Sequence, residues 1–238
     1  MLAVDRSSPR VTLTGAAGRI GRAIVSLLPA HWIVRGTDLT ADERLGALDV
    51  RDLQACRRAF TGVDAVVHLA AIPEPAASWQ LLLPTNVVGA YNVAQAAADC
   101  GVRRLVLASS LHSMSGVPYG TQSRSDDQPR PGNLYGATKA WAEALGAWIA
   151  ATTTTSVVAL RIGYFAELRP DVQTVAAREV SAWLSPRDAA ELVRAAVESE
   201  FTGFFVANGL SANRYRAADL EATMRQLGYK PVDDVWAQ

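Results

Sequence analysis

Three glycines at intervals of three residues, Gly15, Gly18 and Gly21, separate a short apolar run from a helical pattern. The run Arg10–Thr14 is typical of a buried strand, and Arg19–Leu28 carries apolar side chains at helical spacing. In such a strand–turn–helix unit, Gly15 permits a tight turn, Gly18 lets a ligand approach the backbone, and Gly21 allows close packing of the helix. The free N–H groups at the helix N-terminus favour phosphate groups. This feature predicts a nucleotide-binding fold.

Strand-like and helix-like segments alternate along the rest of the chain. The further predicted strands are Ile33–Thr37, Leu45–Leu48, Ala65–Leu69, Arg104–Ala108, Val157–Ile162 and Phe204–Ala207. The further predicted helices are Leu53–Phe60, Asn86–Asp99, Leu134–Ala151, Asp188–Glu198 and Ala217–Leu227. This order predicts an α/β fold of the Rossmann type, a doubly wound parallel sheet in one domain over residues 1–238. We expect segments at about 164–185 and 208–238 to form a small portion that covers the substrate.

The composition limits the partners of the chain. Lys plus Arg and Asp plus Glu number 23 each, so the basic excess typical of nucleic-acid binding is missing. Two cysteines, Cys56 and Cys100, are too few for a disulfide framework or a Cys-rich metal site, which favours a reducing compartment. No apolar run approaches the roughly 20 residues that span a bilayer. We therefore expect a cytoplasmic protein without a metal, nucleic-acid or membrane partner.

Two acidic residues at predicted strand ends concern the choice of cofactor. Asp38 closes the second strand, where a carboxylate can accept hydrogen bonds from adenosine ribose hydroxyls and repel a 2′-phosphate. This position favours NAD over NADP, although Asp38 could instead cap a following helix and the nearby Arg35 could soften the preference. Asp49, followed by Val50, ends the third strand and could lie near the adenine amino group.

Tyr135 and Lys139 lie four residues apart on a predicted helix, so both side chains point the same way. A phenol with an ordinary pKa near ~10 is a poor base at neutral pH. A neighbouring ammonium and an oxidised nicotinamide would both favour the phenolate and allow proton transfer. Ser110 ends a strand upstream of the tyrosine and can hold a substrate oxygen beside it. The three side chains indicate proton removal from a substrate hydroxyl.

With these residues the chain resembles the short-chain dehydrogenase/reductase superfamily, in its extended branch of epimerase- and dehydratase-like proteins. The resemblance also rests on His68-Leu69-Ala70-Ala71, Asn86, Arg161-Ile162-Gly163 and Ser185-Pro186-Arg187-Asp188. It implies that Tyr135 is the general base, that Lys139 tunes it and binds the nicotinamide ribose, and that Ser110 orients the reacting hydroxyl. His68 is then a structural histidine. The implied cofactor contacts are Gly15, Ala17, Gly18, Arg19, Ile20, Gly21, Asp38, Asp49, Val50, Leu69, Ala70, Ala71, Asn86, Tyr135, Lys139 and Ile162.

Within this branch, uronate dehydrogenases are the most similar in pattern, and they use NAD to oxidise C1 of a hexuronic acid. The likeness implies substrate contacts from Ser110, Leu111, His112, Tyr164 and Arg178. A guanidinium at Arg178 would bind a substrate carboxylate, or it could be a solvated helix arginine. His112 could contact substrate or cap its loop. The family carries asparagine at Leu111 and serine at Tyr164, so these two less polar exchanges argue against a hexuronate substrate.

Three functions follow from the sequence. The leading hypothesis is an NAD-dependent dehydrogenase acting on a hydroxyl of a small sugar, sugar acid or polyol. A nucleotide-sugar epimerase or dehydratase is the second, although few residues remain after Phe204–Ala207 for a nucleotide-binding subdomain. A dinucleotide-sensing regulator is the third, although such proteins typically lose the Tyr–Lys pair.

A homodimer through the helix after Tyr135 is plausible by analogy with the superfamily. Trp141 and Trp148 lie on this helix at positions i and i+7, which is ordinary core spacing. We interpret these two tryptophans as core residues rather than as ligand contacts.

Overall fold

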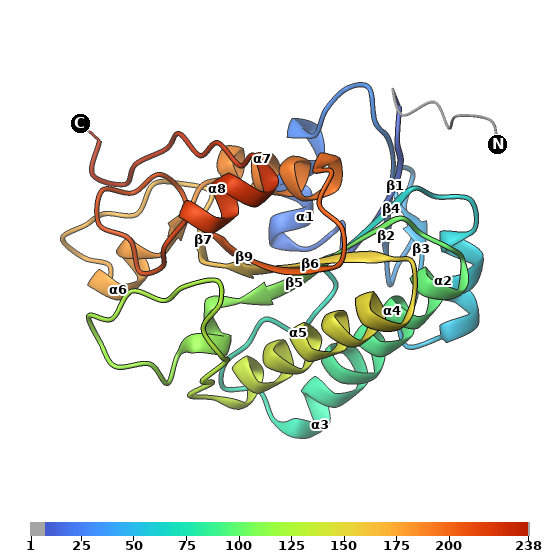
Figure 1. Cartoon of the computed structure of the whole chain (residues 1–238), viewed down its shortest axis with the longest axis horizontal. Coiled ribbons are helices and arrows are strands. Elements are labelled where there is room, and N and C mark those ends of the chain that lie inside the picture. Colours follow the sequence, from blue (N-terminus) through green and yellow to red (C-terminus); the bar gives the residue numbers. More distant parts are fainter. Residues whose placement is uncertain (1–7, 238) are drawn as a thin grey trace.

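Seven parallel strands form the central sheet of the computed structural model, which describes residues 8–237 (Figure 1). The strand order is β3-β2-β1-β4-β5-β6-β9, so the order reverses between β1 and β4. In doubly wound sheets, a crevice for a ligand opens at that reversal, beyond the carboxyl ends of the strands. The bounds are β1 Arg10–Thr14, β2 Ile33–Asp38, β3 Gly46–Ala47, β4 Ala65–His68, β5 Arg104–Ser110, β6 Ser156–Ile162 and β9 Phe204–Gly209.

Helices cover both faces of this sheet (Figure 1). On one face lie α2 Leu53–Phe60, α4 Ala90–Asp99 and α5 Leu134–Thr152. On the other lie α1 Arg19–Ile24, α7 Pro186–Glu198 and α8 Glu221–Leu227. Each layer has its own apolar core against the sheet. Every residue of β4, and of β6, is buried, which matches the continuous apolar runs of both segments. The predicted Rossmann-type, single-domain fold is confirmed.

Shorter elements fill the connections. A turn of 3₁₀ helix follows β5 at Leu111–Met114, and another follows α1 at Val25–Leu27. Two short strands, β7 Tyr164–Phe165 and β8 Trp183–Leu184, pair in parallel, with α6 Ala177–Ser181 between them. The remaining elements are α3 Trp79–Leu82 and a π-helical segment at Leu83–Gly89.

Two predicted helices begin elsewhere, for identifiable reasons. Asn86 lies in the π-helical segment, where Pro84 lacks the N–H that a regular α-helix uses, and α4 itself begins at Ala90. The helix predicted from Ala217 begins at Glu221, because the carbonyl of Ala217 accepts the N–H of Ser123 in a short extended bridge. Helical spacing alone cannot reveal such a contact between distant segments.

The interpretation of the two α5 tryptophans as core residues is wrong. Trp141 is 40% exposed and Trp148 is 46% exposed. The buried stripe of α5 instead contains Leu145 and Ile149, which belong to the core cluster on that side of the sheet. A spacing of seven residues identifies a stripe on a helix without saying which stripe faces the sheet. Within residues 8–237, no helix combines the length and the apolar character needed to cross a membrane.

Candidate active site

The glycine turn after β1 is pressed against the end of β4. Gly15 has φ +73°, and a Cβ at this position would lie 2.5 Å from the backbone nitrogen of Ala70. Only glycine satisfies both conditions. The N–H of Ala17 donates to the carboxylate of Asp38 at 2.9 Å, which ties the turn to the end of β2. Gly18 is the N-cap of α1 and forms no side-chain capping hydrogen bond, and it lines the same cavity as Gly15 and Gly21.

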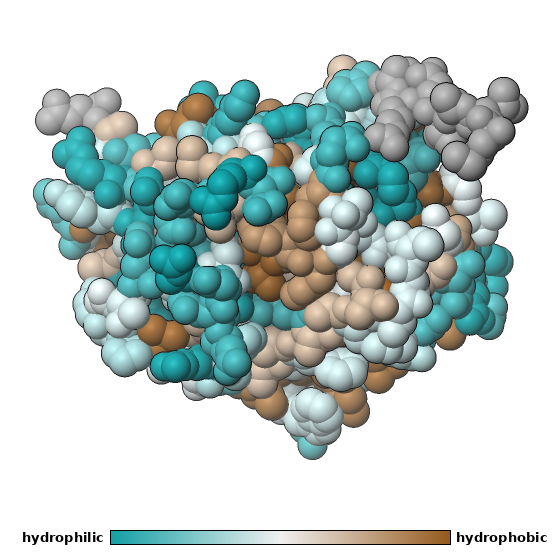
Figure 2. Space-filling view, in the orientation of Figure 1, coloured by the Kyte–Doolittle hydropathy of each residue, from teal (hydrophilic) through white to brown (hydrophobic). Residues whose placement is uncertain are grey.

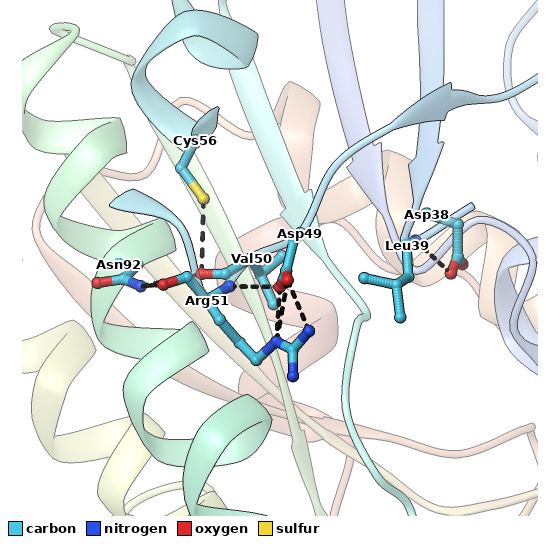
Figure 3. Close-up of polar contacts among 7 residues, drawn as sticks. All are labelled: Asp38, Leu39, Asp49, Val50, Arg51, Cys56 and Asn92. Atoms are coloured by element: carbon cyan, nitrogen blue, oxygen red, sulfur yellow. Dashed lines mark hydrogen bonds and ion pairs between the residues drawn. The ribbon is translucent and has the colours of Figure 1, made fainter. Parts of the chain in front are cut away.

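Two carboxylates lie at the ends of neighbouring strands: Asp38 is the last residue of β2, and Asp49 follows β3 (Figure 3). Asp38 accepts the N–H of Leu39 as well as that of Ala17, and no helix follows it, so the helix-cap alternative is wrong. Asp49 is bound by the guanidinium of Arg51, with Nε and Nη2 at 2.8 and 2.7 Å. These hydrogen bonds lower the pKa of Asp49. The Asp38 carboxylate therefore lies beside the glycine turn, whereas the Asp49 carboxylate is paired with the guanidinium of Arg51.

A cavity of about 1050 Å³ opens at the carboxyl ends of the central strands. In Figure 2, hydrophobic residues gather near the middle of the face, over the region where Figure 1 shows β6, β9 and α5, and hydrophilic residues lie around them. The cavity brings together most of the predicted site: Gly15, Gly18, Arg19, Ile20, Gly21, Leu69, Ala71, Ser110, Leu111, His112, Tyr135, Lys139, Ile162, Tyr164 and Arg178. The predicted residues outside its lining are Ala17, Asp38, Asp49, Val50, Ala70 and Asn86.

Tyr135 and Lys139 lie in the first turns of α5. The carboxamide oxygen of Asn133 accepts the N–H of Gly136 at 2.7 Å and caps this helix. A Cβ on Gly136 would collide with the carbonyl oxygen of His112, so glycine lets α5 begin directly against the turn after β5. Lys139 Nζ donates to the carbonyl of Ala108 at 2.8 Å and lies 5.5 Å from the centre of the Tyr135 ring. The helix and strand thus meet where the chemistry is expected.

Burial sets the protonation of this pair. It raises the pKa of Tyr135, while a hydrogen bond with Ser110 and the positive charge of Arg19 act in the opposite direction. It lowers the pKa of Lys139 to about 8. Tyr135 is accordingly a neutral phenol in the free protein, and a further positive charge in the cleft is needed to make it an effective base.

Two polar residues support the site from behind. His68 is buried, its Nδ1 lies 2.8 Å from Thr14 Oγ1, and burial lowers its pKa to about 3. It is the structural histidine that we expected. Asn86 accepts the N–H of Ile72 and donates to the carbonyl of Ile72 and to Thr138 Oγ1. Asn86 therefore fastens the segment after β4 to α5, outside the lining of the cleft.

A buried ion pair beneath the cleft escaped the sequence analysis. Arg161 donates from Nε and Nη2 to the two oxygens of Glu143, at 2.9 and 2.8 Å. Oε1 of Glu143 also accepts the hydroxyl of Ser109 at 2.6 Å, and Arg161 donates to the carbonyls of Arg124 and Asp127. A signal was present, because Glu143 lies four residues after Lys139 on the same helical face.

His112 and the arginines Arg178, Arg214 and Arg216 also line the cleft. The His112 ring meets Tyr135 edge-on, with centroids 5.5 Å apart. Arg178 Nη1 donates to the carbonyl of Ser115 at 3.4 Å. Arg214 and Arg216 reach the lining from the C-terminal segment, where no motif had indicated them. Parts of the predicted covering segments thus lie on the cleft wall, as Tyr164, 177–182, 214–217 and Trp236.

No group of three or more potential metal ligands among His, Cys, Asp and Glu occurs in residues 8–237. The cleft offers the phenol of Tyr135, the ammonium of Lys139, the hydroxyl of Ser110 and the imidazole of His112. A Ser–Tyr–Lys group facing a glycine turn can move a proton to or from a bound hydroxyl.

Comparison with known proteins gives one family and several full-length relatives. Residues 11–199 match the model of the NAD dependent epimerase/dehydratase family. The chain is 40% identical to an L-arabinose 1-dehydrogenase (NAD(P)(+)) of Haloferax volcanii, over 94% of this chain and 97% of that protein. It is 32% identical to an NAD-dependent glucose-6-phosphate dehydrogenase of the same organism, over 94% and 93%. The crystal structure of a tyrosine-to-alanine mutant of uronate dehydrogenase from Agrobacterium tumefaciens, complexed with NAD, superposes with a TM-score of 0.85 at 29% identity, covering 96% of this chain and 86% of that chain.

Proposed function

The chain belongs to the NAD-dependent epimerase/dehydratase family, and we propose that it oxidises the C1 hydroxyl of a small sugar or sugar acid with NAD. The observation that carries this proposal is the meeting of Ser110, Tyr135 and Lys139 in one cleft with the glycine turn. The similar proteins act on a pentose, a hexose phosphate and a uronate, by their names, so dehydrogenation of a sugar is their common activity.

The residues of the glycine side fit NAD. Gly15, Gly18 and the first residues of α1 line the cavity, and no side chain caps this helix start, so a pyrophosphate could bind against the backbone there. Asp38 would hold the adenosine ribose, Asp49 and Val50 would lie near the adenine, and Lys139 would hold the nicotinamide ribose. NAD, when bound, supplies the acceptor for the two electrons and the hydrogen that leave the carbon.

The chain's own residues handle the hydroxyl proton. Ser110 Oγ and Tyr135 Oη would both bind the reacting hydroxyl, since they are hydrogen-bonded neighbours in the free protein. Tyr135 would take the proton as the carbonyl forms. Lys139, fixed by the carbonyl of Ala108, would stabilise the phenolate with its positive charge. The buried surroundings exclude water and strengthen that interaction.

The charges at the substrate end favour sugars that carry an acidic group. Arg178, Arg214 and Arg216 line this end together with a single acidic residue, Glu179. Across residues 8–237, none of these three arginines forms an ion pair with a carboxylate. A carboxylate or phosphate on the substrate could therefore be bound there without breaking an ion pair within residues 8–237.

NADH formation tests the proposed function. Purified protein would be assayed with NAD and L-arabinose, D-glucose 6-phosphate, D-galacturonate or D-glucuronate. We expect steady NADH production with at least one sugar, and a loss on the order of 10²–10⁴-fold in Tyr135→Phe with NAD affinity within a few-fold by calorimetry. Full activity in Tyr135→Phe would refute the role of the phenol. An epimerase would instead convert its substrate with no net NADH.

A homodimer through α5 is also part of the proposal. Trp141, Trp148 and the neighbouring Tyr91 of α4 are exposed by two-fifths or more, which is unusual for large apolar side chains on adjacent helices. A second copy of the chain would cover them.

The thiols of Cys56 and Cys100 are free, which suits a reducing compartment such as the cytoplasm.

A further inference from the structure

Asn133 serves two neighbours at once. Its Oδ1 accepts the N–H of Gly136 at 2.7 Å, which fixes the orientation of the carboxamide. Its Nδ2 therefore faces His112, with Nδ1 of the imidazole at 3.0 Å. A carboxamide nitrogen only donates hydrogen bonds, so Nδ1 of His112 has to accept.

The acceptor role of Nδ1 determines where the ring carries its proton. Burial and the positive charge of Arg178 lower the pKa of His112, and the opposing charge of Glu179 is the smaller effect. The ring is therefore neutral at pH 7, with one N–H group. With Nδ1 accepting, that N–H is on Nε2.

The ring is also held in place beside the reacting group. The backbone N–H of His112 donates to Ser110 Oγ at 3.1 Å, and its carbonyl accepts the Ser115 hydroxyl at 2.9 Å. The planes of the His112 and Tyr135 rings meet at 71°, in an edge-to-face arrangement. A fixed donor next to Ser110 and Tyr135 lies close to whatever oxygen is attached near the oxidised carbon.

We propose that Asn133 is a positioning residue that fixes the tautomer of His112, so that Nε2–H donates a hydrogen bond to a sugar oxygen adjacent to the oxidised carbon. The acceptor is the ring oxygen or the neighbouring hydroxyl of the sugar. This inference rests on the proposed function for its substrate, whereas the tautomer can be measured without any substrate.

The first experiment is nitrogen-15 NMR of the histidine rings. The chain has only three histidines, so His112→Gln assigns the signals of this ring. We expect unprotonated Nδ1 and protonated Nε2 in the wild type near neutral pH. Asn133→Asp keeps the helix cap, because a carboxylate accepts the Gly136 N–H, but it can only accept from His112. In that variant Nδ1 should become protonated and the pKa of His112 should rise. A protonated Nδ1 in the wild type would overturn the inference.

The second experiment is steady-state kinetics with the most active sugar of the panel. Asn133→Asp should raise KM for the sugar about tenfold, the value expected for one lost hydrogen bond, while NAD affinity stays unchanged. The increase in KM should become smaller at low pH, because a protonated His112 carries Nε2–H again, despite the surrounding charges of Arg178 and Glu179. His112→Gln, which retains a donor, should outperform His112→Phe.

The two experiments separate the possible failures. If the NMR result holds and Asn133→Asp binds the sugar as well as the wild type does, the donor role is wrong. If the wild type turns over none of the sugars, the proposed function fails. In that case the His112 NMR signals are recorded after adding D-galacturonate with NADH, and a shift of these signals decides whether Nε2–H still contacts a sugar. Thermal unfolding shows whether the start of α5 stays folded in each variant. The melting temperatures are compared with that of Asn133→Ser, which also keeps a capping side chain.

Discussion

The buried ion pair between Arg161 and Glu143 allows a direct test of what holds the loop before α5 in place. Both side chains are almost completely buried, at 1% and 4% exposure. Arg161→Met would leave the Glu143 carboxylate in the interior with only the hydroxyls of Ser109 and Ser113 as partners. It would also release the carbonyls of Arg124 and Asp127 in the loop before α5.

The expected loss is large for a single substitution. Removing one partner of a buried ion pair costs about 3–5 kcal/mol, because the remaining charge is uncompensated. For a chain of this length, each kcal/mol corresponds to about 2–4 °C, so the melting temperature should fall by about 6–20 °C. The double variant Arg161→Met with Glu143→Met removes both charges and should recover most of that loss.

Urea unfolding followed by circular dichroism, with thermal melts, would measure all three proteins. The matched control is Arg225→Met, which breaks an exposed pair with Glu221 and should change stability by less than about 1 kcal/mol. An Arg161→Met protein as stable as this control would refute the argument that the loop depends on the pair. If the double variant is no more stable than Arg161→Met, the released loop carbonyls account for most of the lost stability.

Three further predictions concern protonation, cofactor choice and assembly. Burial lowers the pKa of His68 from 6.5 to about 3, so the folded state binds fewer protons than the unfolded state, and the free energy of unfolding decreases as pH falls through that window. In urea titrations, the free energy of unfolding of His68→Gln should decrease less steeply with falling pH, and an unchanged slope would contradict this. Asp38→Ser should raise the ratio of kcat/KM for NADP over NAD by at least about tenfold; an unchanged ratio in NAD- and NADP-dependent assays would exclude the role of the carboxylate. Trp148→Glu should convert a dimer to monomers in sedimentation, and a monomeric wild type would end the dimer proposal.

The strands and the glycine turn could be predicted because their signals are local. Strands β4 and β6 contain continuous apolar runs, and the turn at Gly15 needs a residue without a side chain because it lies close to another backbone segment. Tyr135 and Lys139 could be paired from helical spacing alone. The face of α5 that packs against the sheet could not be predicted in this way, because the contact of Gly136 with the turn at Leu111–Met114 sets the orientation of the helix.

Contacts between distant segments account for most of what was missed. Arg161, Glu143 and the carbonyls at 124–127 come from three separate regions, and no periodicity links them. The same holds for Arg214 and Arg216, which enter the cleft from a segment without regular structure. Their positions depend on tertiary packing, which local patterns do not encode.

The substrate end shows how one fold can change specificity without changing its chemistry. Leu111 and Tyr164, which stand where uronate dehydrogenases carry small polar residues, pack partly against the core as well as lining the cleft. Under the proposed function, polar recognition near the reacting carbon would depend on Ser110 and His112, which suit any sugar with an oxygen beside C1. Charge recognition would depend on the exposed arginines of α6 and of the C-terminal segment. Because the two functions are carried by different segments, replacing the outer arginines should alter which sugars are accepted while the proton transfer at Tyr135 stays intact.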